Sequence, residues 1–104
     1  MDITLLTFDG CPNGKPARVL LRRTLAELGL TAAIRNAVIK NEVQAEEQHF
    51  LGSPTIQING RDIEVHRRSD EASFSCRMYQ TKEGSSGIPP KDMLVAALNE
   101  AREE

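Results

Sequence analysis

The sequence is poor in the residues that mark several special classes of protein. Its 7 glycines and 5 prolines among 104 residues are too few for a collagen-like or low-complexity chain. No apolar run approaches the roughly 20 residues that a membrane helix needs. Two cysteines cannot build a disulfide framework, so the expected setting is the reducing cytoplasm. The length and the 39% of hydrophobic residues instead predict a single globular domain over residues 1–104.

The charge balance argues against a nucleic-acid partner. The 13 lysines and arginines are outnumbered by 15 acidic residues, which leaves a net charge of −2 and a pI of about 5.7. A nucleic-acid-binding domain usually presents a basic surface, and the chain also has no glycine-rich phosphate loop. The start of the chain alternates like a strand and includes an acid, so neither a secretory signal nor a membrane partner is expected.

The first part of the chain changes from a strand pattern to a helix pattern. Residues 3–8 form a short apolar run typical of a strand buried on both faces, and the turn-forming stretch at 9–14 ends it. An apolar stripe at helical spacing follows, formed by Ala17, Leu20, Leu21, Leu25 and Leu28. Pro16 is tolerated only in a first turn, so this helix should begin within a few residues of Cys11, and Gly29 should end it.

The rest of the chain contains a hairpin, a polar segment and a final helix. Strands are expected at 31–39, 55–58 and 62–65, a short helix capped by Asn41 and Gln44 at 41–50, and a helix after the prolines at 89–90. The final helix would bury Leu94, Ala97, Leu98 and Ala101. Asn59-Gly60 is the dipeptide preferred in the tight turn of a hairpin. Residues 66–87 are too long for a structureless loop, and their middle, 74–80, is either a further strand or an ordered excursion.

This order of elements predicts an α/β fold. A strand, a crossover helix and a second strand make a parallel pair, and the later hairpin adds antiparallel strands. The expected architecture is thioredoxin-like: a mixed sheet of about four strands, in the chain order β-α-β-α-β-β-α, with helices on both faces.

Two motifs carry a resemblance to a known superfamily: Gly10-Cys11-Pro12-Asn13 after the first strand and Gly52-Ser53-Pro54-Thr55 before the hairpin. In these motifs the chain resembles the thioredoxin and glutaredoxin superfamily, in which a thiol at the first strand–helix junction faces a cis proline. Further motifs between residues 59 and 90 resemble short bacterial thioredoxin-like proteins, some of them labelled alkylmercury-lyase-like. The superfamily motif Cys-x-x-Cys is incomplete here, because Gly14 stands where the second cysteine would be.

The resemblance implies thiol chemistry at Cys11 and a partner site around it. Cys11 would attack a disulfide of a protein or a small molecule, with glutathione as a co-substrate and no other cofactor. A cis bond before Pro54 would leave the backbone of Ser53 open beside Cys11, where a bound peptide could pair with it. The residues expected to contact the partner are Pro12, Asn13, Lys15, Ser53, Pro54 and Thr55.

The position of Cys11 favours a reactive thiol. Unpaired N–H groups and the positive end of the dipole at a helix N-terminus stabilise a thiolate, which is the form that attacks disulfides. The alternative is that Cys11 is a small apolar residue of the core, which is common for a free cysteine.

Cys76, far along the chain, is the second thiol. If it meets Cys11, it can resolve a mixed disulfide, or the two thiolates can bind a soft ion such as Hg(II). The alternative is a structural cysteine packed near Phe74 and Tyr79.

Three functions therefore fit the sequence. The favoured one is a thiol-disulfide oxidoreductase, or a monothiol glutaredoxin-like protein, acting through Cys11. The others are a protein that binds thiophilic ions or thiol compounds with Cys11 and Cys76, and a non-catalytic interaction domain. His49 and His66 do not lie at metal-ligand spacing with the cysteines, so no zinc site is expected. The protein is expected to be a monomer or a weak dimer.

Overall fold

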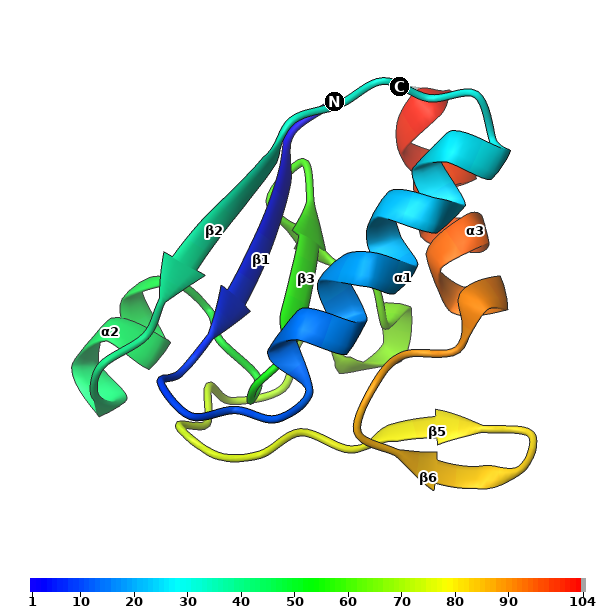
Figure 1. Cartoon of the computed structure of the whole chain (residues 1–104). Helices are drawn as coiled ribbons and strands as arrows, with labels where there is room; N and C mark the ends of the chain where they lie inside the picture. Colours follow the sequence, from blue (N-terminus) through cyan, green and yellow to red (C-terminus); the bar gives the residue numbers. More distant parts are fainter. Residues whose placement is uncertain (104) are drawn as a thin grey trace.

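A four-stranded mixed sheet forms the centre of the computed structural model, which describes residues 1–103 (Figure 1). Its strands are β1 (Ile3–Thr7), β2 (Ile34–Val38), β3 (Thr55–Ile58) and β4 (Arg61–Asp62), in the spatial order β2-β1-β3-β4. β1 and β2 are parallel, whereas β3 is antiparallel to both β1 and β4. This is the α/β, thioredoxin-like architecture that the order of elements predicts.

Three helices cover the two faces of this sheet, as predicted. α1 (Gly14–Glu27) and α3 (Lys91–Arg102) lie on one face, and the shorter α2 (Glu42–Glu47) lies on the other (Figure 1). Side chains alternate along β1, so Ile3 and Leu5 pack with α1 and α3, whereas Leu6 packs with Ala45 of α2. The buried residues of α3 are the expected Leu94, Ala97, Leu98 and Ala101. Within residues 1–103, no helix is long and apolar enough to cross a membrane.

The predicted cap and turn residues are confirmed. The Asn41 side chain accepts a hydrogen bond from the Gln44 backbone N–H at 2.9 Å, which caps α2. Asn59 and Gly60 have φ angles of 54° and 79°, as the type I′ turn between β3 and β4 requires. Gly29 follows the C-cap of α1 with a φ of 67°, a conformation that costs glycine little.

Several elements are shorter than their patterns predict. β2 begins at Ile34 rather than at residue 31, and α2 ends at Glu47 rather than near residue 50. β4 ends at Asp62 because the chain leaves the sheet there and turns into a short 3-10 helix, η1 (Val65–Arg67). The alternation at 62–65 therefore does not mark a longer strand: Asp62, Ile63 and Glu64 are all buried, and only Val65 is exposed.

The long polar segment is ordered and has two parts. Residues 73–77, here called the Cys76 segment, run alongside residues 50–53, and the Ser73 N–H donates to the Phe50 carbonyl at 2.8 Å. After this excursion, β5 (Tyr79–Thr81) and β6 (Gly84–Ser86) form a separate two-stranded hairpin. The segment is thus an ordered excursion followed by a strand, so both expectations for residues 74–80 hold in part.

Candidate thiol site

Cys11 lies in the turn between β1 and α1, as predicted. Its N–H donates to the Phe8 carbonyl at 3.3 Å, and its own carbonyl accepts from the Gly14 N–H, the first helical residue, at 3.5 Å. The residue is half-buried and is in no disulfide. Cys11 is therefore at the N-terminal end of α1 and is not enclosed in the core.

The Ser53–Pro54 peptide bond is cis, as the resemblance implies. The expectation that this bond leaves the Ser53 backbone open is wrong, because Ser53 is fully buried. Its N–H donates to the Ser75 carbonyl at 2.8 Å, and its carbonyl accepts from the Arg77 N–H at 3.0 Å. The chain's own Cys76 segment thus occupies the position that a bound peptide was expected to take.

This pairing places the Cys76 segment beside Ser53, close to the end of β1. Cys76 lies directly opposite Ser53 in a parallel bridge, and the Ser53 hydroxyl accepts from the Phe8 N–H at 3.3 Å. The rings of Phe8 and Phe74 pack edge to face, with centroids 5.7 Å apart. The Cys76 segment therefore contacts the end of β1, from which the Cys11 turn continues. Figure 1 shows both segments at the same end of the sheet. Cys76 is exposed and is also in no disulfide.

A buried ion cluster of Arg77, Asp62 and Glu64 holds the Cys76 segment in place. The Arg77 side chain is fully buried and makes two hydrogen bonds to the Asp62 carboxylate, at 2.7 and 2.8 Å, and one to Glu64 at 3.1 Å. Burial alone would lower the pKa of Arg77, but the hydrogen bonds and charges of these acids raise it above its ordinary value. Arg77 is therefore charged in the interior, one residue after Cys76.

The ion cluster also contacts the cis proline through Tyr79. The Arg77 guanidinium lies over the Tyr79 ring, 4.3 Å from its centroid, in a cation–π arrangement. The Tyr79 hydroxyl donates to the Pro54 carbonyl at 2.5 Å. Burial raises the pKa of the Tyr79 phenol above its ordinary value. One charged side chain thus connects the cis proline with the backbone that carries Cys76.

A glycine permits this close packing. Gly52 has a φ of 114°, and a β carbon built there would lie 2.9 Å from the β carbon of Arg77 and 3.2 Å from the Ser75 carbonyl oxygen. A larger residue at this position would push the Cys76 segment away from Ser53.

The other predicted partner contacts divide into interior and surface residues. Pro54 and Thr55 are buried, and the Thr55 hydroxyl accepts from Arg77 at 3.1 Å, so neither offers a surface to a ligand. Both residues face the core, and the expectation that they contact a partner stays a prediction. Pro12 and Lys15 are exposed beside Cys11. Asn13 is half-buried, and its side chain packs against Gly87.

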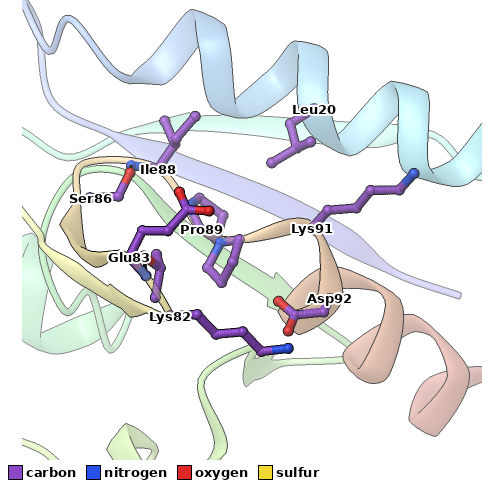
Figure 2. A pocket seen from close by; sticks show the side chains of 10 residues that line it. Leu20, Lys82, Glu83, Ser86, Ile88, Pro89, Lys91 and Asp92 are labelled. Atoms are coloured by element: carbon purple, nitrogen blue, oxygen red, sulfur yellow. Dashed lines mark hydrogen bonds between the residues drawn. The ribbon is translucent and has the colours of Figure 1, made fainter.

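One hollow lies beside the β5–β6 hairpin and another beside the residues that follow β1, and neither cysteine lines either of them. The first has a volume of about 510 Å³ and lies between the hairpin, Leu20 of α1 and the start of α3 (Figure 2). A second cavity of about 500 Å³, here called the aromatic hollow, lies beside the Cys11 turn. Its lining residues are Phe8, Asp9, Ile39, Lys40 and Phe74.

Within residues 1–103, no group of three or more histidine, cysteine or acidic side chains is arranged to hold a metal ion. The His49 ring contacts the Arg68 carbonyl at 2.8 Å, and His66 is exposed on η1.

Both cysteines and the cis proline are expected from the sequence and its resemblance, but the ion cluster is not. Its acids are separated from Arg77 by 15 and 13 positions along the chain. Neither spacing corresponds to a helix or hairpin contact, so no local pattern indicates the pairing. The sequence around Arg77 gives no other signal, because its neighbours Cys76 and Met78 are less polar than Arg77 and yet are exposed in the structure.

Comparison with known families matches residues 16–98 to the model described as "Domain of unknown function (DUF2703)". The chain therefore belongs to the DUF2703 family. The matched stretch includes Cys76 and the whole ion cluster, and it begins after Cys11. Searches of curated proteins and of solved structures found no match.

Proposed function

We propose that this DUF2703 protein is a thiol-disulfide oxidoreductase in which Cys11 attacks and Cys76 resolves. The observation that carries the proposal is the bridge between Cys76 and Ser53, next to the cis proline. This bridge, with the contact between Phe8 and Phe74, brings a second thiol segment to the Cys11 turn. Cys76 would thereby replace the cysteine that is missing at Gly14.

The proposed reaction consists of two thiol–disulfide exchanges. The Cys11 thiolate attacks one sulfur of a substrate disulfide, the substrate S–S bond breaks, and one substrate thiolate leaves and takes a proton from water. The Cys76 thiolate then attacks the sulfur of Cys11 and releases the second substrate thiol. The substrate gains two electrons, and the protein is left with a disulfide between Cys11 and Cys76. Two molecules of glutathione thiol would return both cysteines to the reduced state and become glutathione disulfide.

The surroundings of each thiol suit its step. Cys11 is half-buried just before the N-terminal end of α1, and the exposed Lys15 lies in the first turn of that helix. Cys76 is exposed, while Arg77 fixes the backbone directly after it. The proposed location of this reaction is the cytoplasm, where glutathione keeps thiols reduced.

Mass spectrometry after treatment with glutathione disulfide tests the proposal. The wild-type chain should lose two hydrogens as the internal disulfide forms, whereas Cys76→Ser should accumulate a glutathione adduct on Cys11. Cys11→Ser is the matched control, and it should react only at the slow rate of an ordinary exposed thiol. Equal adduct rates in the two variants, or a wild-type chain that keeps its adduct, would contradict the assigned roles.

A second candidate function follows from the same two thiols. Both are free and lie on contacting segments, and paired thiolates bind thiophilic ions such as Hg(II). Titration with Hg(II) alone should then give one ion per chain, with the tight binding lost in either Cys→Ser variant. If neither glutathione disulfide nor Hg(II) reacts, the remaining function is that of a non-catalytic interaction domain.

A further inference from the structure

The aromatic hollow lies where an open α/β sheet commonly binds its ligand. Phe8 and Asp9 directly follow β1, and Ile39 and Lys40 directly follow β2. Because these two strands are parallel, their carboxyl ends meet at one edge of the sheet, and the crevice outside such ends is a common binding position. The volume of about 500 Å³ lies within the range of small-molecule sites.

The wall of the hollow is shared by the two thiol segments. Phe8 accepts the hydrogen bond from the Cys11 N–H through its carbonyl, and Phe74 is two residues before Cys76. A molecule stacked on the exposed part of the Phe74 ring would therefore lie against the two segments that carry the cysteines.

The chemistry of the lining favours a flat, neutral ligand. Phe8 and Phe74 meet at an interplanar angle of 69°, and 39% of Phe74 remains exposed, so part of its ring is available for stacking. Ile39 adds apolar surface. The two charged residues of the lining, Asp9 and Lys40, have opposite signs and give no net charge.

We propose that the aromatic hollow binds the ring of a small neutral aromatic disulfide and presents its sulfurs to Cys11. This inference rests on the proposed function, because it names the substrate class of that reaction. The exchange has the same balance as above: Cys11 forms a bond to one sulfur, and the other sulfur leaves as an aromatic thiol. Polar aliphatic disulfides lack a group for the hollow and would react more slowly.

Binding is tested without thiol chemistry in the double variant Cys11→Ser/Cys76→Ser. Dithiodipyridine, a neutral aromatic disulfide, should cause saturable changes in the backbone amide NMR signals of Phe8, Ile39 and Phe74. Hydroxyethyl disulfide, which is aliphatic and polar, should cause none. Changes that are absent, or that are spread over the whole surface, would overturn the hollow as a binding site.

Selectivity is tested by the rates at which Cys11 reacts with the same two disulfides in the Cys76→Ser background. Each rate is divided by the rate at which free glutathione reacts with the same disulfide. The normalised rate of Cys11 should be about tenfold higher for the aromatic disulfide than for the aliphatic one, which corresponds to the free energy of one aromatic contact. Phe74→Ser should abolish this preference. Val43→Ser, at an exposed apolar residue of α2, is the matched control and should preserve it.

The two proposals can fail separately. In the first outcome, the rates of Cys11 with the two disulfides have the same ratio as the rates of free glutathione, and no saturable NMR change appears. In that case the substrate class is wrong while the thiol function stands. If Cys11 reacts with neither disulfide faster than a free thiol, the oxidoreductase proposal fails. The NMR titration then still decides whether the hollow binds an aromatic ligand.

Discussion

Replacing Arg77 by leucine should cause a large loss of stability. Arg77 is the central cation of the ion cluster, and its guanidinium bonds Asp62 twice and Glu64 once. The Asp62 side chain is fully buried and the Glu64 side chain is 4% exposed. Without Arg77, both carboxylates lose the buried partner that compensates their charges.

The size of the effect follows from this geometry. Breaking a buried ion pair on one side costs about 3–5 kcal/mol, because the partner charge stays in the interior. We expect Arg77→Leu to lower the free energy of unfolding by that amount. Adding Asp62→Asn should recover part of the loss, because it removes one of the stranded charges.

Urea unfolding followed by far-ultraviolet circular dichroism measures the effect. The control is Arg35→Ala, which breaks the pair of Arg35 with Asp2, where the side chains are 71% and 58% exposed. Exposed pairs contribute about 0–1 kcal/mol, so the control should stay near the wild type. An Arg77→Leu loss no larger than that of the control would refute the reasoning, since the buried carboxylates would then have another source of compensation.

Three further predictions concern single positions. Gly52→Ala should destabilise the fold by about 1–3 kcal/mol in urea unfolding, because its β carbon meets Arg77 and its φ is 114°. Gly84→Ala, with a φ of 115° and nothing within 4 Å, measures the backbone cost alone and should cost less. Burial raises the pKa of Tyr79, so the stability it contributes is present below the ordinary phenol pKa of about 10 and declines above it. With one tyrosine and no tryptophan, phenolate absorbance should appear together with unfolding, and phenolate in a folded chain would contradict this. Asn41→Ala should cost about 1 kcal/mol of unfolding free energy through loss of the α2 cap, and an unchanged midpoint would exclude that role.

The elements that the sequence predicts well are those determined by neighbouring residues. The Asn59-Gly60 turn, the Asn41 cap and the apolar stripes of α1 and α3 depend on side chains a few positions apart. Their physical causes are a permitted backbone conformation, a local hydrogen bond or burial of one helix face. The order of the elements then restricts the sheet to one main arrangement.

The features that the sequence did not predict depend on distant contacts. The Ser53 backbone was expected to be open, because nothing near Ser53 indicates that residues 75 and 77 bond it. Asp62 and Glu64 are buried on either side of the buried Ile63, and the distant Arg77 supplies the charge that compensates both acids. Whether Cys76 approaches Cys11 likewise depends on a pairing across the fold.

The ion cluster closes the chain between residues 62 and 77 without using sulfur. Closing a flexible loop of this length costs roughly 2–3 kcal/mol of chain entropy, and here buried ionic contacts offset that cost. In many small domains a disulfide performs this task, and the anchored segment then moves when the bond is reduced. In this chain the segment is held by ionic contacts, which the oxidation or reduction of a thiol does not break. In the proposed exchange, oxidation of Cys76 would therefore leave the ionic anchor of its backbone intact.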